Sequence, residues 1–426
     1  MLQFDADNRV ISAKEYKAIL VGVQPGEDIS YSMEELAGLA SAAGAQVIGQ
    51  MIQNLEKIHP RTYVGKGKLE ELAELCSSMD ADLVIVNDEL SSIQLRNMEE
   101  ILPVSVVDRT LLILDIFASR ATSREGKLQV EMAQLQYRLP RLTGMGKSLS
   151  RLGGGIGTRG PGEKKLETDR RHIQKRLDEI RREMEEHRGH RKVQRAQSER
   201  SELPVAALVG YTNSGKSSIM NRMLAMEDRQ DKQVLEKDML FATLDASRRL
   251  ITTEDRHRFL LIDTVGFVSK LPHTLVKAFR STLEEVAEAD LLLHVVDASF
   301  PEADFHIEVT NKVLRELGAG DKPTLMLFNK IDLAADFSPL AYGKNALAIS
   351  TKTGEGYEAF LARIKELLFG GSAVVDVLIP YERGDLVAYL CAKTQPQTMS
   401  HLEDGTLLTV ELDLADQKRF EAYILS

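Results

Sequence analysis

The 426-residue chain has few cysteines, and their spacing limits what they can do. Cys76 and Cys391 lie 315 positions apart, and neither belongs to a CxxC motif or a Cys/His cluster. A disulfide framework and a structural zinc site are therefore not expected, and the composition fits a reducing cytoplasm.

The chain also lacks long apolar segments. Spanning a bilayer takes about 18 or more consecutive apolar residues, whereas the most apolar run, Leu291–Val296, is only as long as a strand. The first ten residues, MLQFDADNRV, contain two aspartates and no apolar core, so they do not resemble a secretory signal. The sequence predicts a cytoplasmic protein without a membrane span, for which any association with a membrane would be peripheral.

The formal charge is negative overall, with 54 Lys and Arg against 64 Asp and Glu. This balance of -10 argues against a protein coated with positive charge for nucleic-acid binding. The length predicts roughly three folded domains, and a hydrophobic content of 43% is typical of soluble globular proteins.

Short apolar runs alternate with helical patterns in the first part of the chain, which we assign as an α/β domain over residues 1–112. Strands are expected at Ala18–Val23, Ala45–Met51, Asp82–Val86 and Val104–Val107, and helices at Met33–Ala43, Leu69–Cys76 and Ser91–Ile101. Alternation of this kind predicts a largely parallel sheet. The run Gly65-Lys66-Gly67-Lys68 is compatible with a phosphate contact. The full glycine fingerprint of a dinucleotide-binding site is absent, however, which favours an ordinary loop before a helix.

Residues 113–200 are expected to form a long helical hairpin. A helical pattern continues to about Leu139, and a second, strongly charged one covers about Lys164–Gln197. Between them lies the glycine-rich segment Arg151–Arg171, with five glycines between Gly153 and Gly160 that cannot form a regular element unaided.

Charge is distributed unevenly, because the hairpin region is basic. Residues 140–201 contain 17 Lys or Arg and 9 Asp or Glu, a balance of +8 that leaves -18 for the remainder. A solvated helix with ion pairs along its surface would explain the charge of the helix alone. The glycine-rich loop favours nucleic acid instead, since flexible backbone and arginines together suit phosphate contacts. The candidate RNA-binding residues are Arg151, Gly153, Gly154, Gly155, Arg159, Lys164 and Lys165.

The strongest motif is GYTNSGKS at residues 210–217, between an apolar run at Val205–Val209 and a helical pattern at Ser218–Met226. This strand, loop and helix context is that of a phosphate-binding loop. Lys216 would reach the β- and γ-phosphates, and the Ser217 hydroxyl would bind Mg²⁺. The candidate nucleotide-binding residues here are Gly210, Tyr211, Thr212, Asn213, Ser214, Gly215, Lys216, Ser217 and Ser218.

Further motifs indicate that the nucleotide bound here is a guanine nucleotide. A strand at Phe259–Ile262 leads into Asp263-Thr-Val-Gly266, where Asp263 would hold Mg²⁺ through water and Gly266 would contact the γ-phosphate. A strand at Leu325–Phe328 ends in Asn329-Lys330-Ile331-Asp332. The Asp332 carboxylate can accept both N–H groups that guanine offers, Lys330 would cover the base, and Asn329 would link the loops.

Two more segments complete the predicted site. The strand at Ala346–Ile349 leads into Ser350-Thr351-Lys352, whose amides would face the guanine O6. Phe241-Ala-Thr-Leu-Asp245 lies between the phosphate loop and Asp263, so Thr243 would coordinate Mg²⁺ only when the γ-phosphate is present. We take Lys216, Thr243 and Gly266 as the catalytic candidates.

Phe267 follows Gly266, where many GTPases have a glutamine that orients the attacking water. A phenylalanine cannot do so, which predicts slow intrinsic hydrolysis and a missing catalytic element supplied by a partner or an ion. One candidate is K⁺ held near the phosphates by Asn213, and ordinary hydrogen bonding within the loop is the alternative.

Five motifs together, GGGIGTRGPGE with LETDRR, GYTNSGKSS, FATLD and DTVGF, resemble the HflX family of ribosome-binding GTPases. The resemblance covers nearly the whole chain. It implies a monomeric, cytoplasmic GTPase that binds GTP and GDP with Mg²⁺ and meets 23S rRNA of the large (50S) ribosomal subunit through the hairpin loop. It also implies splitting of stalled or hibernating 70S ribosomes under stress, with hydrolysis stimulated by the ribosome. Ser214, Ser218, Lys164-Lys165 and Thr351 depart from the usual family residues.

The expected architecture is thus α/β and multidomain. A P-loop GTPase domain with a parallel-sheet core (201–370) follows the α/β domain and the hairpin, and a small α/β domain (371–426) ends the chain. In this last domain we expect strands at Val374–Ile379 and Leu407–Leu412 and helices at Asp385–Ala392 and Ala415–Leu425.

Two other functions remain open. One is a nucleotide-gated 50S-binding or assembly factor that does not split ribosomes. The other is an ATP-dependent RNA-remodelling enzyme with a second nucleotide site in the N-terminal domain, although the sequence contains no second phosphate loop.

Overall fold

The computed structural model describes residues 16–26, 28–142, 161–198, 203–226, 247–253, 257–270, 285–334, 337–370, 373–394 and 396–425. The chain forms two compact units. The first comprises residues 1–194 with 238–245 and 269–280, and the second comprises 195–237, 246–268 and 281–426. Arg151, Gly153–Gly155, Arg159, Phe241 and Thr243 lie outside the described residues.

The first unit opens with a four-stranded parallel sheet in the order β2-β1-β3-β4. Its strands are β1 (Tyr16–Gln24), β2 (Ala45–Asn54), β3 (Leu83–Val86) and β4 (Ser105–Asp108), and its helices are α1 (Ser30–Ala42), α2 (Lys66–Ser78) and α3 (Ser92–Glu99). Every strand and helix expected here is confirmed. The apolar runs form strands because their β-branched side chains, such as those of Val84 and Val106, pack into one shared core.

Local sequence sets where the helices of this unit begin. Ser91 and Gln94 form a reciprocal cap, in which Gln94 N donates to Ser91 Oγ at 3.2 Å and Ser91 N donates to Gln94 Oε1 at 2.9 Å. At the end of β4, Asp108 accepts a hydrogen bond from Leu111 N at 2.9 Å and so begins α4 (Arg109–Arg120). Both arrangements satisfy amides that have no partner within the helix.

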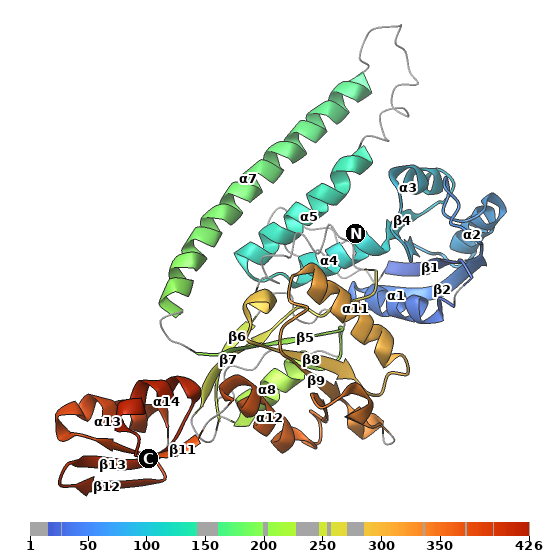
Figure 1. Cartoon of the computed structure of the whole chain (residues 1–426). Coiled ribbons are helices and arrows are strands. Elements are labelled where there is room, and N and C mark those ends of the chain that lie inside the picture. Colours follow the sequence, from blue (N-terminus) through green and yellow to red (C-terminus); the bar gives the residue numbers. More distant parts are fainter. Residues whose placement is uncertain are drawn as a thin grey trace. The chain divides into compact units, whose positions relative to one another are not determined.

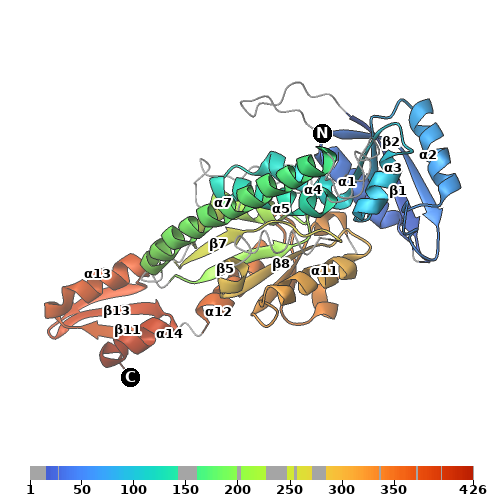
Figure 2. The ribbon, with the colours of Figure 1, turned by 90° about the horizontal axis from the view of Figure 1, so that it is seen from above.

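Two long helices, α5 (Arg124–Leu142) and α7 (Pro161–Ser198), lie side by side in Figures 1 and 2. Leu128 packs with Ile180 and Met184 between them, and the Arg176 guanidinium bonds both Glu131 carboxylate oxygens at 2.7 and 2.8 Å. Pro161 occupies the first position of α7, where its missing N–H costs no helical hydrogen bond. The two expected helices are confirmed.

The second unit contains a six-stranded sheet in the order β10-β9-β8-β5-β7-β6. The strands are β5 (Val205–Gly210), β6 (Ser247–Thr252), β7 (Arg258–Asp263), β8 (Leu291–Asp297), β9 (Thr324–Asn329) and β10 (Ala346–Ala348), with helices α8 (Lys216–Met226), α11 (Ala303–Glu316) and α12 (Tyr357–Phe369). All neighbours are parallel except β6, which runs antiparallel to β7. The sequence did not indicate β6, since Arg248 and Arg249 interrupt its apolar pattern.

The last part of the second unit is a three-stranded antiparallel sheet in the order β11-β13-β12. Its elements are β11 (Ala373–Ile379), α13 (Gly384–Lys393), β12 (Thr398–Leu402), β13 (Gly405–Leu412) and α14 (Leu414–Phe420). It has its own core, which includes Val377, Leu408 and Phe420. The exposed strand β12 shows no apolar alternation and was not expected.

The expected helix at Ala415–Leu425 is wrong in its second half. The α-helix ends at Phe420, and a single 3₁₀ turn follows at Glu421–Tyr423. After this turn the chain pairs with β11, because Leu425 N donates to Asp376 O at 2.8 Å and Ile424 lies opposite Val377. Pairing with a distant strand therefore outweighs the local helical pattern.

Within the described part of the chain, no helix combines the length and the apolar character that crossing a bilayer requires.

Two glycines with similar backbone angles offer a test of the packing in the second unit. Gly318 and Gly356 have φ of 73° and 75°, but a Cβ at Gly318 would meet nothing within 4 Å, whereas one at Gly356 would lie 2.1 Å from Ala348 O. Gly318→Ala should cost about 1 kcal/mol of stability from its backbone angle alone. Gly356→Ala should lower the melting temperature further, because the backbone must also move; equal shifts for the two variants would contradict this packing.

Candidate guanine-nucleotide site

Strands β5, β7, β8, β9 and β10 of the second unit run parallel in one sheet, so their carboxyl ends lie along one edge of it. Strand β5 ends at Gly210, β7 at Asp263, β8 at Asp297 and β9 at Asn329, and β10 leads into Ser350. Parallel α/β sheets bind ligands at this edge. The described motif residues, which are distant in sequence, are therefore brought to one place.

The phosphate loop connects β5 to α8, and its lysine is buried. Lys216 is only 6% exposed, and its Nζ donates to the carbonyl oxygens of Gly210 at 3.1 Å and Tyr211 at 2.6 Å. Gly215 has φ of 96°, and a Cβ there would lie 2.1 Å from Asn329 Nδ2, so only glycine fits. The loop thus presents an ammonium group and the first amides of α8 to the same space.

Burial affects the charge of Lys216. Its pKa is lowered to about 8, mainly by desolvation; Asp263 opposes this shift, and Lys330 contributes to it. A bound phosphate group would stabilise the charged form of the Lys216 amine and so raise its pKa again.

Gly266 lies close to the phosphate loop. A Cβ at this position would come within 2.8 Å of Thr212 Cα and 3.0 Å of Lys216 Nζ. The next residue, Phe267, is 2% exposed; its N–H donates to Gly210 O at 3.1 Å, and its carbonyl accepts from Thr212 N at 2.7 Å. The motif that follows β7 is therefore tied to the phosphate loop through backbone.

Two oxygen-bearing side chains fit a divalent cation. Ser217 Oγ donates to Asp263 Oδ2 at 2.6 Å, and Asp263 is fully buried. A hydroxyl and a carboxylate are the hard oxygen ligands that Mg²⁺ prefers. Among the described residues, no cluster of three or more His, Cys, Asp or Glu side chains is placed to hold a metal.

Asn329 joins the loops that would surround the base. Its Nδ2 donates to Ser214 O at 2.9 Å, and its Oδ1 accepts from Thr351 N at 3.1 Å. Ser350 Oγ donates to Asp332 Oδ1 at 2.7 Å and accepts from Thr353 N at 3.1 Å. The Asp332 side chain is exposed and so remains accessible to a ligand.

Sequence reasoning missed two polar residues that support these loops. Asp297 accepts from Lys330 Nζ at 2.6 Å, which fixes the lysine of the base loop. Its position at the end of the buried strand β8 is the same signal that identified Asp263 at the end of β7. Arg222 Nη1 donates to Thr351 O at 2.7 Å, but nothing in the pattern of α8 distinguishes it from an ordinary surface arginine.

Three rings stack beside the phosphate loop. The His306 ring lies between Tyr211, at a centroid distance of 3.7 Å, and Phe300, at 4.3 Å. Burial lowers the pKa of His306 to about 4, although Asp297 raises it. The imidazole is therefore neutral at physiological pH and acts as a packing group that supports Tyr211.

The glycine-lysine run of the first unit does not form a comparable site. Gly65 precedes α2 and its N–H donates to Gln53 Oε1 at 2.9 Å. Lys66 and Lys68 pair with Glu70 and Glu71 of their own helix at 3.9 and 2.6 Å. These contacts favour the structural interpretation of this loop.

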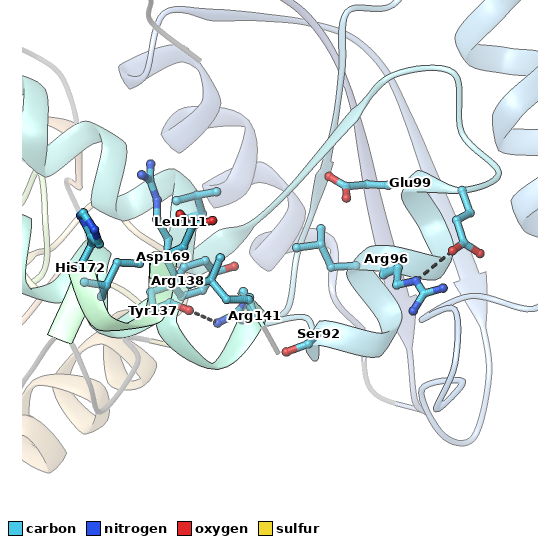
Figure 3. Close-up of a pocket in the computed structure, with 13 residues that line it drawn as sticks. Ser92, Arg96, Glu99, Leu111, Tyr137, Arg138, Arg141, Asp169 and His172 are labelled. Atoms are coloured by element: carbon cyan, nitrogen blue, oxygen red, sulfur yellow. Dashed lines mark hydrogen bonds and ion pairs between the residues drawn. The ribbon is translucent and has the colours of Figure 1, made fainter. Parts of the chain in front are cut away.

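A separate cavity of about 730 Å³ lies in the first unit, among residues of α3, α5 and α7 (Figure 3). Two of its arginines have partners within the protein. Arg96 Nε bonds Glu100 at 2.9 Å, and Arg141 bonds Leu90 O at 2.6 Å while its guanidinium lies 3.4 Å from the centre of the Tyr137 ring. The cavity contains none of the predicted nucleotide-binding residues.

The fold and the motif order define a P-loop GTPase that binds guanine nucleotide. Four family models cover the chain in sequence: a GTP-binding GTPase N-terminal domain over residues 30–118, its middle region over 120–198, a "50S ribosome-binding GTPase" domain over 205–330 and an HflX C-terminal domain over 339–422. The chain belongs to the HflX family of GTPases, and GTP hydrolysis is its activity.

Relatives match along almost their full length. GTPase HflX of Caldanaerobacter subterraneus is 46% identical over 410 residues, which cover 96% of this chain and 94% of that protein. GTPase HflX of Escherichia coli is 38% identical over 412 residues, covering 95% of each. A GTP-binding protein from Sulfolobus solfataricus, solved with GDP, is 24% identical with a TM-score of 0.43 and covers 83% of this chain and 98% of that one.

The lowered pKa of Lys216 predicts a pH-dependent affinity. Bound phosphates keep the amine protonated, so the complex holds more protons than the free protein above about pH 8. GDP affinity should fall as the pH rises through 8, towards a limiting slope of about tenfold per pH unit. Titration with a fluorescent GDP analogue between pH 7 and 9 measures this.

Lys216→Arg provides the control, since a guanidinium stays charged throughout this range. Ionisation of guanine itself affects both proteins equally and cancels in the comparison. The same slope in both proteins would show that Lys216 does not titrate.

Proposed function

We propose that the motif residues at the carboxyl edge of the second sheet bind GTP and GDP. Lys216 and the amides of the phosphate loop bind the phosphates, and Gly266 contacts the γ-phosphate. Asp332 accepts the guanine N–H groups, Lys330 covers the base, and the amides of Ser350, Thr351 and Lys352 face its O6. The convergence of these segments on Asn329 supports the assignment.

Ser217 and Asp263 would hold Mg²⁺, the first directly and the second through water, with Thr243 joining when GTP is bound. The metal, once bound, neutralises phosphate charge that develops during hydrolysis. We also propose K⁺ near Asn213, whose left-handed backbone, with φ of 60°, shapes the loop there. Equal hydrolysis rates in potassium and sodium chloride at matched ionic strength would remove the K⁺ proposal.

The proposed partner is the large ribosomal subunit. The observation that carries this proposal is the match of residues 205–330 to the model described as "50S ribosome-binding GTPase". The basic balance of residues 140–201 on an otherwise acidic chain supports rRNA as the contacted surface. The candidate contacts are Arg151, Gly153–Gly155, Arg159, Lys164 and Lys165.

The charged side chains of α7 also form ion pairs within the helix, so its basic charge is not available for RNA alone. Arg171 pairs with Glu167 at 2.8 Å and Arg181 with Asp178 at 2.8 Å, so these arginines stabilise the helix itself. The RNA contact is therefore assigned to the segment before α7 and the first turns of this helix, up to Lys165, rather than to the whole length of the helix.

We propose that the chain, as a cytoplasmic monomer, splits stalled or hibernating 70S ribosomes under stress, with hydrolysis stimulated by the ribosome and followed by release. The four proposed domains are 1–112, 113–200, 201–370 and 371–426. Four family matches follow one another along the chain in the same order, and the last begins at residue 339, within the proposed GTPase domain. A nucleotide-gated factor that occupies the 50S subunit without splitting is the second candidate, since it needs the same nucleotide site and the same basic loop.

Charge reversal tests the ribosome contact. Arg151→Glu with Arg159→Glu should weaken co-sedimentation with 50S subunits by at least about tenfold and reduce the salt dependence of binding by about one ion per lost phosphate contact. GTP affinity should stay unchanged.

The control is Lys66→Glu with Lys68→Glu, which makes the same change in net charge on α2, outside the glycine-rich segment of the sequence. If both double variants bind 50S subunits equally well, the glycine-rich loop is not the RNA contact and the helix charges serve solubility alone.

A further inference from the structure

A half-buried arginine of α8, Arg222, contacts the loop formed by residues 350–355, which we call the O6 loop. Its Nη1 donates to Thr351 O at 2.7 Å. Further along the loop, a Cβ at Gly354 would lie 2.1 Å from Arg222 Nη2, so the guanidinium lies directly against the Gly354 backbone. The arginine and the whole O6 loop belong to the second unit.

The orientation of this guanidinium is fixed by α12 as well as by the loop. Its central carbon lies 5.0 Å from the centre of the Tyr357 ring, which is the distance of a cation–π contact. Tyr357 is buried, and its Oη donates to Ile219 O of α8 at 3.3 Å. Because the ring is bonded to the helix that carries Arg222, the arginine has little freedom to turn away from the loop.

Two of the three amides that we assign to guanine O6 already have partners within the protein. Ser350 N donates to Glu355 O at 3.0 Å, and Thr351 N donates to Asn329 Oδ1 at 3.1 Å. Within the described part of the chain, the amide of Lys352 makes no hydrogen bond. Of the three, it is therefore the donor that remains available to a ligand.

Arg222 binds the carbonyl oxygen of the same peptide unit that contains the Lys352 amide. This peptide is trans, and a trans peptide is planar, with its C=O and N–H pointing in opposite directions. A guanidinium that holds the Thr351 oxygen thus fixes the direction of the Lys352 N–H, which points away from Arg222. The arginine therefore orients the available donor of the O6 loop.

The same helix begins at the phosphate loop. Its first two residues, Lys216 and Ser217, are those proposed to bind the phosphates and Mg²⁺, and Arg222 comes six positions after Lys216. Six residues of an α-helix rise about 9 Å. One rigid helix therefore carries both the phosphate contact and the side chain that orients the O6 loop.

We propose that Arg222 is a positioning residue for guanine recognition, which acts by orienting the Lys352 amide towards O6. The proposal deepens the proposed function and rests on the guanine contact assigned there to the O6 loop. The Asp332 carboxylate, assigned to the guanine N–H groups, is held by Ser350 Oγ instead. Loss of Arg222 should thus affect recognition of O6 more than recognition of the 2-amino group.

The test measures the binding of three nucleoside diphosphates to the full-length protein. 6-Thio-GDP has sulfur, a weak hydrogen-bond acceptor, in place of O6, and IDP lacks only the 2-amino group. The ratio of the Kd values for 6-thio-GDP and GDP reports on the O6 contact, and the ratio for IDP and GDP reports on the contact with Asp332. The variants are Arg222→Met, Arg222→Lys and Arg315→Met.

Arg315→Met is the matched control. Arg315 is an exposed residue of α11, and its Nε donates to Asn311 O of the same helix at 3.3 Å. Its substitution removes the same charge and a bond to a carbonyl oxygen from the same unit, without touching the O6 loop. An effect of charge alone changes the affinity for all three nucleotides equally and cancels in both ratios.

We expect Arg222→Met to weaken GDP binding about fivefold and to lower the ratio for 6-thio-GDP and GDP at least about threefold, because the site no longer favours the oxygen. The ratio for IDP and GDP should stay within about twofold of the unmodified chain. Arg222→Lys keeps a donor for Thr351 O but loses the stacked guanidinium, so it should give intermediate values. Arg315→Met should leave both ratios unchanged. If Arg222→Met does not fold, Arg222→Lys provides the same test.

An unchanged ratio for 6-thio-GDP and GDP in the folded Arg222 variants would overturn the proposal, as would an equal fall in both ratios. An unmodified chain that binds GDP and 6-thio-GDP equally would also overturn it, because no O6 contact would then exist to be oriented. If the unmodified chain does not prefer GDP to ADP, the guanine site itself fails. That result is distinct from a failure of the role of Arg222.

Discussion

The candidate site depends on the two hydrogen bonds of the Asn329 side chain. Through Ser214 O and Thr351 N, this amide connects the phosphate loop to both segments that would surround the base. It can do so only because Gly215 has no side chain, since a Cβ there would lie 2.1 Å from the Asn329 nitrogen. The position of the Asn329 side chain thus depends on glycine at position 215, although the two residues lie 114 positions apart in the sequence.

Around this constraint, each further loop is held by a contact of its own. Lys330 is fixed by Asp297, Thr351 by Arg222, and Ser217 by Asp263. All are short, direct bonds. Lys330, Asp297, Ser217 and Asp263 lie at or near the carboxyl ends of strands, whereas Arg222 comes from within α8. A site held in this way presents polar groups without the need to reorganise, which is the property that specific nucleotide recognition requires.

The parts of the molecule that the sequence predicted well are those with local causes. Apolar runs produced the parallel strands, and Gly215, Lys216 and Ser217 have roles that follow from their place between a strand and a helix. The supports of the site were not predictable because they join distant residues. Nothing near Arg222 indicates a bond to Thr351, 129 residues away, and nothing near Ile424 indicates that the chain end pairs with β11. Strand β6 was missed because its two arginines hide the apolar pattern.

In the proposed function, one guanine-nucleotide site acts together with one basic, glycine-rich loop, and the bound nucleotide controls the action of the protein on ribosomes. Light scattering of 70S ribosomes tests this claim most directly. With the protein and a non-hydrolysable GTP analogue, scattering should fall as subunits separate, and with GDP it should stay constant. Unchanged scattering with the analogue, while the protein co-sediments with intact 70S ribosomes, would contradict splitting and favour a factor that only binds.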